Sequence, residues 1–133
     1  MPFNVPGFKV GHATNEEFHT GVSVILCPDN TVGSADFRGP GSSSRESALL
    51  QPDKPVHFVN GVVLTGGSAL GLGTATGVSR YLAERGIGHP TPIRPIPIVT
   101  ASVVFDLFLG AGEFIPDEEM GYEAAAAAQE NDD

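Results

Sequence analysis

The chain has 133 residues, of which 41% are hydrophobic and 17% are charged, so it can form one compact domain with a buried core, and two domains are not expected. It contains 17 glycines and 11 prolines, which favours many turns and short elements and excludes a coiled coil or a collagen-like chain. The formal net charge of −9 argues against nucleic acid and anionic membrane surfaces as partners.

The acidic excess lies at one end of the chain. Residues 113–133 carry eight acidic and no basic residues, whereas residues 1–112 carry seven basic and eight acidic residues. No apolar run approaches the roughly 20 residues of a membrane span, and the N-terminus lacks the pattern of a signal peptide, so a cytoplasmic location is predicted. The single Cys27 allows no internal disulfide and is expected to be a small core residue.

The first third of the chain predicts a small antiparallel unit. Residues 8–12 and 20–27 have the composition of strands, and they are expected to pair across residues 13–19. Residues 31–37 are predicted to add a third strand and complete a meander. A loop rich in glycine and serine follows, and Ser43 or Ser44 is expected to cap a short helix that ends at Leu50.

The middle of the chain reads as strand, glycine turn and helix. Residues 56–64 form the predicted strand, and residues 69–85 form the predicted helix, which stops at the glycines of residues 86–88. The helix contains three glycines, each costing roughly 0.5–1 kcal/mol relative to alanine. Close packing of the helix against a sheet is the expected compensation for this cost. The three glycines are Gly71, Gly73 and Gly77.

The last third contains a β-branched apolar strand and a terminal helix. Residues 98–109 are predicted as the strand, and residues 116–128 as a helix whose acidic first turn suits the helix dipole. Residues 129–133 are expected to form a flexible, solvated end. Asp106 lies within the apolar strand, where an ionised carboxylate requires partners, so it should accept backbone N–H groups or pair with an arginine.

The turn after residue 64 is the strongest candidate for chemistry. A nucleotide-binding loop is disfavoured because Thr76 stands where the fingerprint wants Gly or Ala, and Leu70 stands where a nucleophile elbow requires Gly. Ser68 is therefore interpreted as a helix N-cap. The N–H groups of Gly66, Gly67 and Ser68 are expected to be free to stabilise an oxyanion or bind a small anion.

Four histidines occur without the spacing of a metal site, so no metal and no cofactor are predicted, and hydrogen-bonded or surface histidines are expected. They are His12, His19, His57 and His89.

Several phrases occur together in an order that resembles one family, the self-cleaving DmpA-type aminopeptidases, whose relatives include β-peptidyl aminopeptidases and nylon-oligomer hydrolases. The resemblance covers nearly the whole chain. The phrases are Val10-Gly11-His12, residues 20–24, residues 38–41, residues 64–72, residues 96–99 and residues 104–107.

The resemblance implies an α/β (α+β) fold, the αββα sandwich of the DmpA and ornithine-acetyltransferase type. In this family a precursor cuts itself ahead of a Ser or Thr, which then attacks amides and can use its own α-amino group as base. Residues 1–133 would be the N-terminal part of the α-chain of a single such domain. The dipeptides Asn30-Thr31 and Gly41-Ser42 are of the type that is cut, but each lies in a predicted turn or loop.

The expected nucleophile therefore lies on a downstream segment or second chain, and no catalytic residue is assigned to these 133 residues. The expected substrate is a peptide or other amide, and the processed unit is expected to form a homo-oligomer. The candidates for the substrate cleft or oxyanion site are Gly66, Gly67, Ser68, Phe105 and Asp106. Some relatives of the family have Tyr at the position of Phe105, where the Tyr hydroxyl can donate a hydrogen bond to the substrate. Phe105 has no hydroxyl and cannot take this role. The alternative is a noncatalytic structural or small-molecule-binding subunit.

Overall fold

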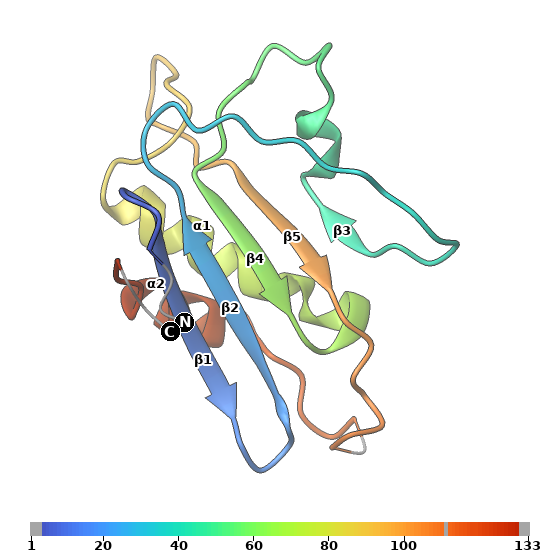
Figure 1. Ribbon diagram of the computed structural model, residues 1–133. Coiled ribbons are helices and arrows are strands. Elements are labelled where there is room, and N and C mark those ends of the chain that lie inside the picture. Colours follow the sequence, from blue (N-terminus) through green and yellow to red (C-terminus); the bar gives the residue numbers. More distant parts are fainter. Residues whose placement is uncertain (1–3, 111, 131–133) are drawn as a thin grey trace.

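A computed structural model describes residues 4–110 and 112–130, and it shows one sheet covered on one side by helices (Figure 1). The strands lie in the order β1-β2-β4-β5-β3, with β4 and β5 parallel and all other neighbours antiparallel. The strands are β1 (Lys9–Asn15), β2 (Thr20–Leu26), β3 (Ser44–Arg45), β4 (Gly61–Thr65) and β5 (Val99–Val103). The helices are α1 (Thr74–Glu84), α2 (Glu118–Ala126) and the 3₁₀ helices η1 (Ser47–Leu50) and η2 (Ser68–Gly73).

The predicted hairpin is confirmed, with β1 and β2 paired from Lys9 opposite Leu26 to Asn15 opposite Thr20. Alternate residues of β2 point toward the helices and are buried, as the period of two predicts. They join a core built from three strands and both α-helices. Its members are Val22, Val24, Leu26, Val63, Val99 and Ala101 from the sheet, and Ala75, Val78, Leu82, Ala124 and Ala125 from the helices.

Glycines let α1, α2 and the sheet approach closely. A Cβ atom at Gly77 of α1 would overlap the carbonyl oxygen of Glu118, and one at Gly121 of α2 would overlap that of Thr74. The helix predicted at residues 69–85 is divided into η2 and α1, so only Gly77 of its three glycines lies in α1. The prediction that these glycines pack against a sheet is wrong for Gly77, which packs against α2. Position 73 has open space around it.

Other boundaries also differ from the sequence predictions. Residues 31–37 form a loop with one bridge between Val32 and Phe58, because β4 occupies the free edge of β2. The strands predicted at 56–64 and 98–109 are confined to β4 and β5, which pair with each other in parallel over five residues. The short helix before Leu50 is a 3₁₀ helix preceded by Glu46, with no side-chain cap.

The terminal helix is present and begins later than predicted. The side chain of Asp117 accepts a hydrogen bond from the backbone N–H of Met120, which makes Asp117 the N-cap of α2. Gln129 exchanges two backbone hydrogen bonds with Val10 and so is tied to β1, contrary to the prediction of a loose end. Residues 131–133 lie outside the described part of the chain. Among the described residues, no helix is long and apolar enough to cross a membrane.

Candidate functional site

The sheet face opposite the helices carries two rows of side chains across the strands. One row, near the carboxyl ends of β4 and β5, is mostly polar; the other, near their amino ends, is mostly apolar. The first row runs through the registered partners His12, Ser23, Leu64, Ser102 and Ser44, and the second through Val10, Ile25, Val62 and Thr100. Neither α-helix covers this face (Figure 1), and only η1 and the loop of residues 31–37 flank its apolar row. We call it the open face.

A cavity of about 550 Å³ lies over the polar row. The Nδ1 atom of His12 lies 2.8 Å from the Oγ atom of Ser23, so the floor carries a hydrogen-bonded imidazole and hydroxyl. Its wall includes Thr20, Gly66 and Asp106. Ligands of open α/β sheets commonly bind at the carboxyl ends of parallel strands, and β4 and β5 end here. This cavity is the candidate site.

A second cavity of about 530 Å³ lies over the apolar row. Its walls include Ile25, Val62, Val59 and Leu50. Cys27 also lines it, directly after β2, and burial raises the pKa of this thiol to about 11. Such a thiol is protonated at neutral pH and behaves as a small apolar side chain.

The turn between β4 and η2 has no free backbone donor among its three central residues. Gly66 N donates to the carbonyl oxygen of Gly21 (2.9 Å), Gly67 N to a carboxylate oxygen of Asp106 (2.8 Å), and Ser68 N to the carbonyl oxygen of Val104 (3.1 Å). The expectation of free N–H groups for an oxyanion or a small anion is therefore wrong. Ser68 is also not the N-cap: Gly67 precedes η2, and no side chain caps it.

Asp106 accepts a hydrogen bond from a backbone N–H, as expected for a carboxylate in an apolar segment, and within the described part of the chain no arginine pairs with it. Its second oxygen accepts a hydrogen bond of 2.7 Å from the hydroxyl of Thr20. Sequence reasoning missed Thr20, because 86 positions separate it from Asp106 and no spacing rule links them. The only available signal was the demand of a half-buried carboxylate for donors.

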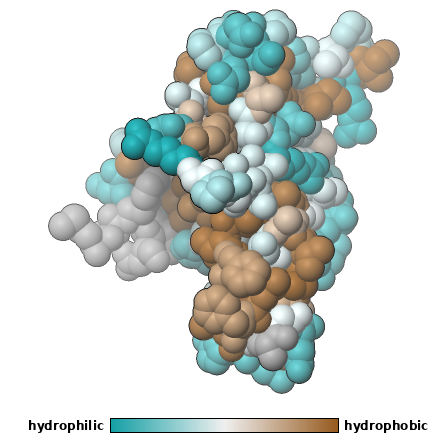
Figure 2. Space-filling model, turned by 90° about the vertical axis from the view of Figure 1, so that its right-hand side faces the viewer, coloured by the Kyte–Doolittle hydropathy of each residue, from teal (hydrophilic) through white to brown (hydrophobic). Residues whose placement is uncertain are grey.

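The candidate residues are only partly brought together. Gly66 and Asp106 line the 550 Å³ cavity, Gly67 is buried behind them, and Ser68 and Phe105 lie outside its described lining. Phe105 is 65% exposed and belongs to an apolar cluster at this end of the molecule, visible as the brown surface low in Figure 2. We call this cluster the apolar tip. Its exposed members, all from the segment after β5, are Val104, Phe105, Phe108 and Leu109.

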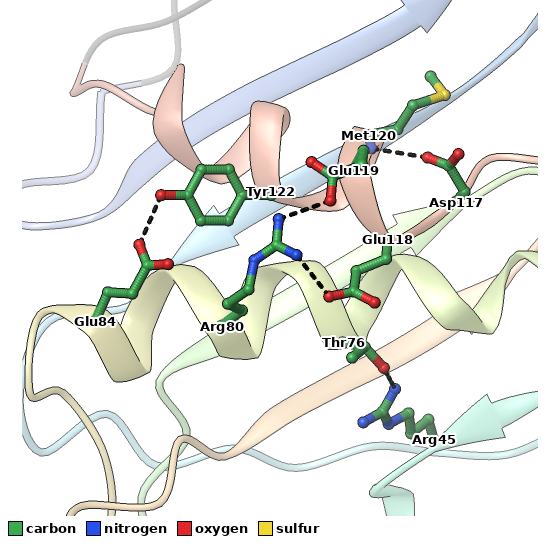
Figure 3. A network of polar contacts seen from close by, with 9 residues as sticks. All are labelled: Arg45, Thr76, Arg80, Glu84, Asp117, Glu118, Glu119, Met120 and Tyr122. Atoms are coloured by element: carbon green, nitrogen blue, oxygen red, sulfur yellow. Dashed lines mark hydrogen bonds and ion pairs between the residues drawn. The ribbon is translucent and has the colours of Figure 1, made fainter.

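A polar network joins the two α-helices on the other side of the sheet (Figure 3). Arg80 of α1 bonds Glu118 and Glu119 of α2, and the hydrogen bond to Glu119 raises the pKa of its guanidinium. Tyr122 donates to Glu84, which raises the pKa of the phenol. These groups hold the scaffold together and do not line the cavity.

Within the described residues, no three side chains of the His, Cys, Asp or Glu type are grouped so as to hold a metal ion. The lining of the cavity offers imidazole and hydroxyl groups beside a carboxylate, which can form hydrogen bonds with a polar ligand.

Comparison with known proteins gives consistent matches over most of the chain. The model of peptidase family S58 matches residues 3–132. An aminopeptidase of Mycobacterium tuberculosis, named as uncharacterized, is 40% identical over 133 residues, which is 94% of this chain and 39% of the relative. A 6-aminohexanoate-oligomer endohydrolase of Paenarthrobacter ureafaciens is 30% identical over 121 residues, which is 91% of this chain and 32% of the relative. The chain thus spans about two fifths or less of the length of these relatives.

Proposed function

Because the chain belongs to peptidase family S58, we propose that it is the N-terminal part of a self-processing amidohydrolase whose Ser or Thr nucleophile lies on a downstream segment. The names of the relatives supply the two substrate classes, namely peptides with a free amino end and amide-linked oligomers of 6-aminohexanoate. The chain supplies the sheet, its helix layer and one wall of the cleft. The other segment supplies the attacking hydroxyl.

The open face is the observation that carries this proposal. A sheet must bury its apolar face, and here one face packs on α1 and α2 while the other presents Ile25, Val62 and Leu64. Leu64 is 50% exposed. A second sheet from the downstream segment would cover these residues and complete the αββα sandwich. It would also close the 550 Å³ cavity into a cleft between two sheets, with Gly66 and Asp106 on one wall.

The test uses the complete natural protein that contains this chain. We expect hydrolysis of amino-acid anilides or short amide oligomers, and we expect intact-mass analysis to show a second polypeptide that begins with Ser or Thr. Changing that terminal Ser or Thr to Ala should abolish both the amide hydrolysis and the self-cleavage that produces the second polypeptide, and this result would support the assignment. Turnover that persists without it, or the absence of any second polypeptide, would refute it.

A noncatalytic subunit that binds a small molecule is the second candidate. The 530 Å³ apolar cavity favours it, because a preformed apolar hollow of this size suits a small ligand. Intact mass separates the two candidates: a lone species of 13.8 kDa that shows no amidase activity favours the binding subunit.

We further propose that the processed unit is a homo-oligomer, with the apolar tip as one contact surface. Light scattering on the purified protein measures its oligomeric state.

A further inference from the structure

Three segments that are distant in the sequence meet at the turn after β4. The turn itself is residues 66–68, the start of β2 provides Thr20 and Gly21, and the segment after β5 provides Val104 and Asp106. Each of the three successive N–H groups of the turn donates to one of the other two segments. Asp106 is the only side chain among these acceptors, and it bonds both of the other segments at once.

The space for the carboxylate is shaped by the absence of a side chain at position 66. A Cβ atom at Gly66 would overlap both Oδ2 of Asp106 and the hydroxyl oxygen of Thr20. Thr20 itself is 9% exposed, so its hydroxyl has few alternative partners. The carboxylate, the hydroxyl and the glycine therefore fit one another as a unit.

The turn needs such a restraint because one of its residues, Ser68, is in an unfavourable backbone region. Gly67 has φ +85° and Ser68 has φ +54°, and for Ser this left-handed conformation is sterically costly. Strained backbone persists only where the surroundings determine it. The hydrogen bond from Gly67 N to Asp106 fixes the first of these two residues directly.

We propose that Asp106 is a positioning residue, which shapes the wall of the 550 Å³ cavity by accepting hydrogen bonds from Gly67 N and Thr20 Oγ1. It acts through the turn and the threonine hydroxyl, and its negative charge is not offered to the substrate. The expected effect of Asp106 on turnover rests on the amidohydrolase function proposed above. The restraint that Asp106 places on the turn is independent of that function.

Two substitutions of Asp106 separate hydrogen bonding from charge. In Asp106→Asn the amide oxygen can still accept from Gly67 N, and the amide NH₂ can donate to Thr20, whose hydroxyl then becomes the acceptor. In Asp106→Ala both bonds are lost. Thr20→Val removes only the hydroxyl, and Asp53→Ala, at an exposed loop carboxylate, is the matched control.

Amide hydrolysis by the complete natural protein gives the first readout. We expect Asp106→Ala to lower kcat by about 10-fold or more with a smaller change in KM, because a small displacement of the cavity wall misaligns bound substrate. Asp106→Asn should recover most of that loss, and Thr20→Val should fall between them. Equal losses for Asp106→Asn and Asp106→Ala would assign the role to charge and overturn the proposal, as would an unchanged kcat in Asp106→Ala.

Hydrogen exchange at the Gly67 amide gives a second readout that needs no turnover. We expect strong protection in the natural protein and in Asp106→Asn, and at least about a 10-fold faster exchange in Asp106→Ala. If no amide is hydrolysed by the natural protein, the proposed function fails while this comparison still tests the restraint. Equal exchange rates of the Gly67 amide in Asp106→Ala and in the natural protein would overturn the proposed restraint.

Discussion

At the scale of single residues, the candidate site depends on the lack of a Cβ atom at position 66. Gly66 is buried between the hydroxyl of Thr20 and the carboxylate of Asp106, and its own carbonyl lies where a Cβ at Gly71 would go. Two glycines thus allow the turn, the threonine and the aspartate to occupy one small volume. Backbone approach this close is tolerated only where the Cβ is absent.

Replacing Gly66 by Ala tests this packing. We expect Gly66→Ala to reduce the free energy of unfolding by about 2 kcal/mol, because the added methyl group overpacks a site with no room to relax. Urea unfolding followed by circular dichroism measures the change. Gly73→Ala is the control: a Cβ there meets open space at a helical φ of −59°, so this variant should be neutral or slightly stabilising. Equal effects of the two substitutions would contradict the packing argument.

Cys27 provides a second residue-level prediction. Burial raises the pKa of its thiol to about 11, so at pH 8 the thiolate fraction is about 0.1%. We expect iodoacetamide to alkylate Cys27 in the folded protein at pH 8 at least about 10-fold more slowly than in 8 M urea, where the pKa returns to its ordinary range. The rate should rise with pH up to about 11 in the folded state. A folded-state rate that matches the rate in urea would show that the thiol is exposed.

At the scale of elements, α2 is held by packing and by charge. It contacts α1 through Gly77 and Gly121, and it lies against β1, where a Cβ at Gly11 would overlap the carbonyl oxygen of Ala124. Arg80 of α1 adds polar contacts between the two helices (Figure 3). It forms ion pairs with two carboxylates of the first turn of α2, and its guanidinium lies 4.6 Å from the centre of the Tyr122 ring. We call these contacts the Arg80 clasp.

Removal of this clasp should weaken the attachment of α2. We expect Arg80→Ala to lower the free energy of unfolding by a small but measurable amount, because water screens the ion pairs of an exposed arginine even where it bridges two carboxylates and an aromatic ring. The loss should shrink in 1 M NaCl, which screens the ion pairs. Arg94→Ala, at an exposed loop position, is the control and should cost less than half as much. An effect of Arg80→Ala that is independent of salt would assign the contribution to packing.

Local patterns predicted the hairpin and the two α-helices, and long-range pairings decided what the sequence left open. The alternation from Val22 to Leu26 and the acidic first turn of the terminal helix are patterns of neighbouring residues, which the sequence shows directly. The ends of β4 and β5 depend on each other, because each strand extends only as far as its parallel partner. The bond between Thr20 and Asp106 spans 86 positions, so only the folded chain reveals it.

At the scale of the whole molecule, the sheet separates two environments. Helices cover one face, and the open face grades from an apolar row to a polar row toward the candidate site. The apolar tip extends from that same end (Figure 2). A domain that buries only one side of its sheet leaves apolar surface on the other side, and one relative is more than twice as long as this chain. The proposed function assigns the cover of that surface to the downstream segment.

Leu64 offers a direct test of this arrangement in the complete natural protein. It is half exposed in the middle of the polar row, so covering it by a second sheet would bury the remaining half of the side chain, worth roughly half of the 1.5–3 kcal/mol of a fully exposed one. We therefore expect Leu64→Lys to dissociate or destabilise the assembly of this chain with the downstream segment, as measured by native mass spectrometry in increasing urea. Ile93→Lys is the matched control, because Ile93 is 90% exposed in a loop away from the open face. Identical urea midpoints for the two variants would mean that the second segment does not pack on the open face.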